Sequence, residues 1–99
     1  MNTTTTSAAK FTTGKLHLTG EAKNLTEKEI QNFLQMHTEG MSDINQYQAE
    51  VNRQAIAANK GNVISAYECC FGEQIKVYTD LEAQQTTIII VDIDGKIIY

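Results

Sequence analysis

The residues best suited to chemistry in this 99-residue sequence are two cysteines, a histidine and a glutamate. Cys69 and Cys70 are adjacent, and strand neighbours point to opposite faces, so a disulfide between them would be strained. Burial as small apolar side chains is favoured over a nucleophilic role. His37 falls on the apolar stripe of a predicted helix, which favours a core histidine over a general base. Glu68 lies in a predicted strand with its side chain toward the helices, where a carboxylate needs a partner or a raised pKa. Glu68 and His37 are therefore weak catalytic candidates.

The sequence predicts neither a metal site nor a cofactor site. Two histidines, two adjacent cysteines and scattered acidic residues do not have the spacing of zinc ligands. There is no glycine-rich phosphate loop. Asp92-Ile93-Asp94-Gly95 matches the start of a calcium-binding loop, but the later ligands are missing. We therefore expect no metal and no cofactor, and we favour a non-enzyme over an enzyme.

The stretch Ile89-Ile90-Val91-Asp92-Ile93-Asp94-Gly95 resembles the first motif of the haloacid dehalogenase phosphatases. In that family a buried strand ends in Asp-x-Asp-Gly, which would make Asp92 the nucleophile and Asp94 the acid/base. The family continues with a Thr- or Ser-like residue and a long chain that carries a lysine and further acids. Here Lys96 follows at once, and four residues come after Gly95. We therefore interpret Asp94-Gly95 as the turn of a β-hairpin.

Composition excludes several classes of function. The 41% hydrophobic and 20% charged content is that of a folded globular domain. One arginine and no basic cluster, at a net charge of −4, lack the electrostatic pattern of a nucleic-acid-binding protein. No apolar stretch approaches the ~20 residues of a membrane span, and the N-terminus has no secretory signal pattern. We expect a cytoplasmic protein that binds neither nucleic acid nor membrane.

Changes of periodicity divide the chain into helices and strands. Thr26 and Glu29 form a capping box before a helical stripe that Gly40 ends. Ser42 is the expected cap of a second helix, which Gly61 closes. The period then changes to two, which predicts strands. The expected elements are a strand within 11–19, the two helices, strands at 63–71 and 74–80, and a hairpin at 86–99.

These elements predict one α+β domain at residues 11–99, preceded by a flexible N-terminal arm at residues 1–10. Two N-terminal helices should pack on a largely antiparallel sheet of four to five strands, in the order β-α-α-β-β-β-β. Both faces of the last hairpin are apolar, and two helices can cover only one face of the sheet. With Gly72-Glu73 as the turn of the first hairpin, the second face is a candidate interface. It comprises Tyr67, Phe71, Tyr78, Ile88, Ile90, Ile97 and Tyr99.

We therefore expect a small acidic, non-enzymatic interaction module, a homodimer or a binder of another protein through this aromatic and aliphatic face. Equally, the arm and the first strand could fold over that face. The alternative function is a curved-sheet pocket that binds or converts a small molecule, which requires Glu68, His37 and a tyrosine to converge. Cystatins share the strand–helix–strands order, but their Gln-x-Val-x-Gly motif is missing here.

Overall fold

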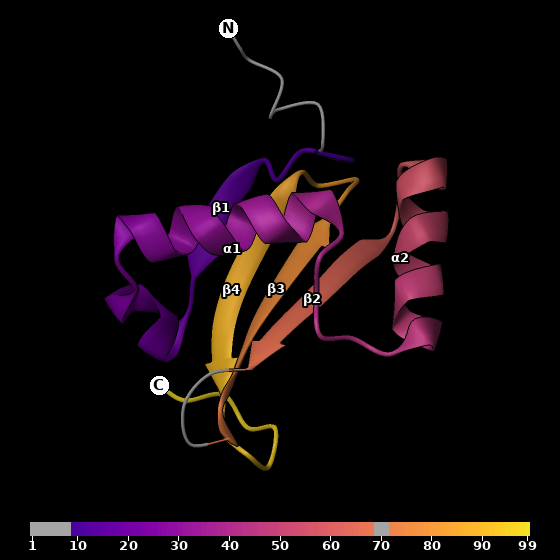
Figure 1. The fold of residues 1–99 in the computed structure, drawn as a ribbon. Coiled ribbons are helices and arrows are strands. Elements are labelled where there is room, and N and C mark those ends of the chain that lie inside the picture. The colour runs from indigo at the N-terminus through magenta and orange to yellow at the C-terminus, as the bar shows by residue number, and fades with distance from the viewer. Residues whose placement is uncertain (1–8, 69–71) are drawn as a thin grey trace, which may run out of the picture.

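A computed structural model describes residues 9–68 and 72–99 of the chain. It confirms an α+β fold with two α-helices and one sheet, and shows that the sheet is four-stranded and mixed (Figure 1). Cys69, Cys70, Phe71 and most of the predicted arm lie outside the described residues. The elements in chain order are β1 (Lys15–Leu18), the 3-10 helix η2 (Gly20–Asn24), α1 (Glu27–Glu39), α2 (Gln46–Ala58), β2 (Asn62–Glu68), β3 (Gln74–Asp80) and β4 (Gln85–Val91).

The strand order in the sheet is β1-β4-β3-β2. β2, β3 and β4 form an antiparallel meander, whereas β1 pairs with β4 in parallel. The predicted fifth strand is not formed as such, because Ile97 makes only an isolated bridge with Val91. A parallel neighbour for β4 arises because the chain leaves β1 through η2 and α1, a crossover of the kind that parallel pairing requires.

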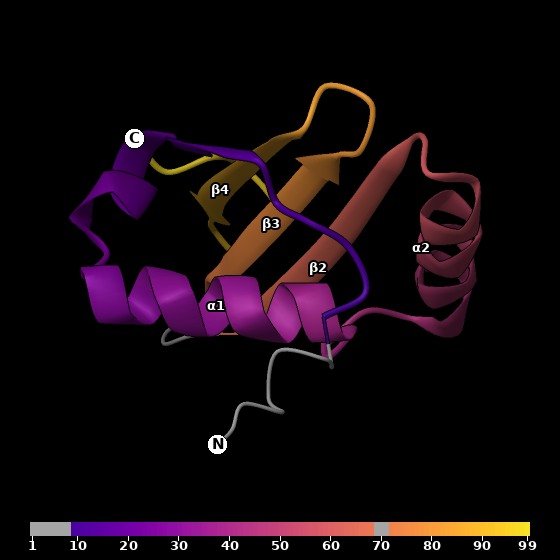
Figure 2. The ribbon, with the colours of Figure 1, turned by 90° about the horizontal axis from the view of Figure 1, so that it is seen from above.

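The α1 helix forms where the local signals predict it. Thr26 accepts from the Glu29 backbone N–H at 3.2 Å, and the Glu29 carboxylate accepts from the Thr26 N–H at 2.8 Å. Gly40 ends the helix with φ of 83°, a left-handed conformation that favours glycine. Its apolar side covers one face of the sheet (Figures 1 and 2). The core beneath it includes Ala22, Ile30, Tyr67, Ile75, Val77, Ile88 and Ile90.

The α2 helix lies alongside β2 at the edge of the sheet (Figure 2). Asn45, not Ser42, is its N-cap and accepts from the Gln48 N–H at 2.8 Å. Asn59 ends it with φ of 56°. The sequence predicted two helices packed on the sheet, but only α1 lies across a face.

The register between β2 and β3 differs from the prediction. Tyr67 pairs with Ile75, and Tyr78 pairs with Ile64. A turn at Gly72-Glu73 would have paired Tyr67 with Tyr78 and put both on one face, but the observed register differs from that pairing by three residues, an odd number. Because side chains alternate along a strand, an odd shift moves every side chain to the other face.

The chain does reverse after β4, but not through a two-residue turn. The Asp92 N–H donates to the Lys96 carbonyl at 2.8 Å, and Gly95 has φ of 84°, so three residues lie between the paired positions. The Asp92 carboxylate accepts the N–H groups of Asp94 and Lys96, each at 2.9 Å. This aspartate therefore holds the turn. Ile98 packs against the core as a result, and Ile97 is exposed.

Candidate functional site

The face of the sheet turned away from α1 carries neither α1 nor α2 (Figures 1 and 2). Cross-strand pairing places Ile64 beside Tyr78 near its centre, and Ala66, Lys76 and Ile89 form the next row. Ile64, Tyr78 and Ile89 are half-buried. We call this surface the open face. The residues on this side of the strands are Lys15, His17, Asn62, Ile64, Ala66, Glu68, Gln74, Lys76, Tyr78, Asp80, Gln85, Thr87, Ile89 and Val91. Ala66 and Val91 are buried.

The central positions of the open face, on β3 and β4, carry Tyr78 and Ile89 together with the polar side chains of Lys76 and Thr87. Burial raises the pKa of the Tyr78 phenol, so this side chain is neutral at physiological pH. Lys15 on β1 and Glu68 at the end of β2 occupy diagonally opposite corners. A mixed face of this kind fits a non-obligate interface, which is about as apolar as the rest of a protein surface.

Of the seven residues predicted as one interface, the six that the structure describes do not share one surface. Tyr67 is buried beneath α1, where its ring lies 5.3 Å from that of Phe33 and its hydroxyl donates to the Met41 carbonyl at 2.7 Å. Burial raises its pKa. Ile88 and Ile90 belong to the same core. Of the rest, Tyr78 lies on the open face, and Ile97 lies on the same side of the sheet, since it pairs with Val91. Tyr99 is exposed in the C-terminal segment, and Phe71 lies outside the described residues.

The two catalytic candidates do not meet. Glu68 is exposed and lies on the open face, and its N–H donates to the Asp43 carboxylate at 3.3 Å. His37 is fully buried between α1 and the opposite face of the sheet. The sheet separates their side chains, so they cannot line one cavity. The convergent site required by the alternative function is therefore not formed by this pair.

His37 is instead part of a buried chain of hydrogen bonds. Its Nδ1 lies 2.6 Å from the Ser65 hydroxyl, and its Nε2 lies 2.8 Å from the Thr79 hydroxyl. Thr79 contacts the Thr86 hydroxyl at 2.7 Å, and Thr86 donates to the Thr13 carbonyl at 2.6 Å. The four side chains are between 0 and 2% exposed. We call this chain the hydroxyl–histidine network.

The carbonyl at one end fixes the direction of every bond in this network. Thr86 uses its one proton on the Thr13 carbonyl, so Thr79 must donate to Thr86. The Thr79 oxygen then accepts from Nε2–H of His37, and Nδ1 accepts from Ser65. His37 is therefore the neutral Nε2–H tautomer, with both ring nitrogens satisfied. The network therefore links α1 to β2, β3 and β4 through satisfied hydrogen bonds.

The buried imidazole predicts that stability falls in mild acid. Desolvation by burial lowers the pKa of His37 from 6.5 to about 4. The unfolded chain therefore binds the extra proton between these values, so stability is complete above pH 6.5 and declines toward pH 4. At pH 5 the loss should be about 2 kcal/mol. Urea unfolding at pH 7 and pH 5 measures it.

Nuclear magnetic resonance (NMR) titration of the His37 ring protons gives an independent readout. We expect a midpoint well below that of an ordinary histidine. A midpoint near 6.5 in the folded protein would contradict the assignment of a sealed, neutral imidazole.

The outer edge of β2 is closed by side chains from the segment that leads into α2 and from α2 itself. Asn52 accepts from the Ile64 N–H at 3.0 Å and donates to its carbonyl at 2.7 Å. Ser42 accepts from the Ala66 N–H at 2.8 Å, and the Asp43 N–H donates to the Ala66 carbonyl at 2.9 Å. These groups take the place of a neighbouring strand and block pairing with another chain at this edge.

Sequence reasoning missed both the network and the closed edge. The available signal for the network was a hydroxyl at a core position of each strand: Ser65, Thr79 and Thr86 alternate in phase with Val63, Val77 and Ile88. Three buried hydroxyls on neighbouring strands require a shared polar partner. Asn52 had a similar signal, as an amide within the predicted second helix and buried in the structure.

Within residues 9–68 and 72–99, no three His, Cys, Asp or Glu side chains gather closely enough to hold a metal ion. Neither of the helices described there has the length and apolar character needed to span a membrane.

Comparisons with known proteins found no counterpart: no protein-family model, no curated protein and no solved structure matches this chain.

Proposed function

We propose that this protein is a small interaction module that forms a homodimer through its open face. The observation that carries the proposal is the group of large apolar side chains in two neighbouring rows of that face, Ile64, Tyr78 and Ile89, on the side of the sheet opposite α1. Burying apolar surface is the main source of favourable free energy in association. A partner sheet is the simplest flat surface that fits.

The corner charges favour a second copy over an unrelated partner. A dimer with two-fold symmetry brings the same surface of both subunits together. If the strands of the two sheets cross at nearly right angles, the corner with Lys15 of each copy meets the corner with Glu68 of the other copy. The two-fold symmetry therefore gives two such contacts. This arrangement makes the face complementary to itself.

The size of the face indicates a reversible dimer. Three strands of seven residues and one of four, spaced about 4.8 Å apart, give a flat area of roughly 400 Å² on each copy. The total is below the ~1,200 Å² of a standard stable interface. We therefore expect a dissociation constant in the micromolar range or weaker.

The replacement Tyr78→Asp should convert the dimer to a folded monomer, because it puts a charge at the centre of the buried face. Sedimentation velocity from about 10 μM to about 1 mM tests this, since a dimer of this area should dissociate within that range. Circular dichroism checks that the variant is folded. Tyr47→Asp is the matched control, because Tyr47 is 78% exposed on α2 and away from the open face.

Charge exchange tests the proposed geometry. Lys15→Glu should weaken the dimer, and the double variant Lys15→Glu with Glu68→Lys should restore it. A monomeric wild-type protein over the whole concentration range would refute the homodimer. Dimerisation unaffected by Tyr78→Asp would place the contact elsewhere.

A further inference from the structure

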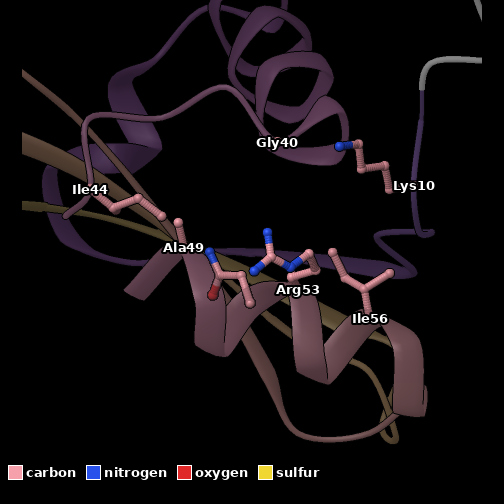
Figure 3. A pocket seen from close by; sticks show the side chains of 7 residues that line it. Lys10, Gly40, Ile44, Ala49, Arg53 and Ile56 are labelled. Carbon is pink, nitrogen blue, oxygen red and sulfur yellow. The ribbon is translucent and has the colours of Figure 1, made fainter. Parts of the chain in front are cut away.

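A hollow of about 270 Å³ lies between the C-terminal end of α1, the α2 helix and Lys10 (Figure 3). We propose that it binds a carboxylate carried on a short aliphatic group. The site is separate from the open face, since it is built on α2 and on the end of α1 rather than on the exposed side of the sheet.

The hollow has an apolar wall. Ile44 comes from the segment before α2, and Ala49 and Ile56 come from α2 itself. Its volume is slightly below the ~300 Å³ at which the usual range of ligand sites begins. Such a wall fits a ligand body of a few carbon atoms.

Two cations complete the hollow. Figure 3 shows Lys10 on the side of Gly40 and Arg53 across from it on α2. The Lys10 backbone is fixed, because its N–H donates to the Thr38 carbonyl at 2.8 Å. A methyl group placed on Gly40 would lie 3.5 Å from the Lys10 ammonium, so this cation sits against the end of α1.

The Lys10 ammonium has no hydrogen bond or ion pair to other side chains within the described part of the chain. Arg53 is paired with Glu50, but a guanidinium has five N–H donors and can bind a second carboxylate. Asn52 also lines the hollow, and its amide is already used by the Ile64 backbone.

None of the seven described residues that line the hollow is acidic, although acids outnumber basic residues twelve to eight in the whole chain. Two cations over an apolar wall, without a lining carboxylate, select an anion with an apolar body. The carboxylate of a free aliphatic acid and the C-terminus of a peptide share this chemistry.

The test is a ¹H–¹⁵N NMR titration of the full chain with acetate, butanoate and hexanoate at constant ionic strength. We expect saturable shifts at the amides of Gly40, Ile44 and Arg53. Affinity should rise by up to about fourfold for each additional methylene group that becomes buried. Hexanamide, which has the same body without the charge, should bind at least about tenfold more weakly.

The double variant Lys10→Gln with Arg53→Gln should lose at least about tenfold in affinity for hexanoate. Lys28→Gln with Lys60→Gln is the matched control, because it removes two positive charges that do not line the hollow. A tripeptide ending in valine, with a free or an amidated C-terminus, distinguishes a peptide C-terminus from a free aliphatic acid as the ligand. Tighter binding of the tripeptide with a free C-terminus than of hexanoate indicates a peptide.

The proposal is overturned if none of the acids gives saturable shifts at concentrations up to about 50 mM. A dissociation constant above this concentration is too weak for specific recognition. It is also overturned if hexanamide binds as well as hexanoate, or if both double variants lose affinity equally.

Discussion

Replacing Thr79 by valine should lower the free energy of unfolding by about 2–3 kcal/mol. Valine has nearly the same shape, so the change removes one hydroxyl and little packing. The fully buried Nε2–H of His37 then loses its acceptor, and Thr86 loses its donor. An unpaired buried donor bears the full desolvation penalty of that group. Thermal unfolding should shift down by about 10–15 °C in a domain of this size.

Thr87→Val is the control for this experiment. Thr87 is the next residue after Thr86 on β4, but its side chain lies on the open face and is half-buried. We expect a change within about 0.5 kcal/mol, the range of ordinary surface substitutions. Equal effects of the two valine variants would mean that the network adds no specific stability.

The second large effect is expected at Asn52. Its replacement by alanine leaves both the N–H and the carbonyl of Ile64 without their partners and opens the edge of β2. We expect a loss of about 2 kcal/mol. The exposed edge should also promote association between sheets. Chemical unfolding and light scattering measure the two effects.

The variant Asn52→Asp distinguishes the hydrogen bonds of the amide from the packing of the side chain, because it keeps the size of the side chain and removes its N–H donor. A carboxylate can accept from the Ile64 N–H but cannot donate to its carbonyl, so this variant should also be destabilised at neutral pH. Gln54→Ala is the control, because Gln54 is exposed on the same helix and bonds only to the Glu50 side chain, at 3.2 Å. A destabilisation by Gln54→Ala as large as that of Asn52→Ala would refute the specific role of the edge contact.

The elements that sequence reasoning predicted well are those with local signals. The α1 helix has its capping box at Thr26 and Glu29 and its stop at Gly40, all within a few residues of its ends. The buried position of His37 also followed from helical periodicity. The hydrogen-bond partners of His37 could not be predicted from this periodicity, because Ser65 and Thr79 lie 28 and 42 residues away in the sequence.

The candidate interface was predicted less well, because faces depend on register. The position of Gly72-Glu73 suggested a short turn, and an odd error in turn length exchanged the faces of β2. Tyr67 moved into the core as a consequence, and Ile64 moved out. The expectation of an uncovered, partly apolar sheet face remains as the proposal. Among the predicted residues that the structure describes, Tyr78 belongs to that face and Ile97 lies on the same side, next to Val91.

The parallel pairing of β1 with β4 also determines when the fold can be completed. Lys15 pairs with Gln85, 70 positions later in the chain, whereas β2, β3 and β4 are joined in sequence by short connections. Closing so long a loop costs entropy before any contact offsets it, so such pairings form slowly. The meander can form first, and β1 must wait for β4. Since Thr13 supplies the last acceptor to the hydroxyl–histidine network, the chain seals His37 only in this final step.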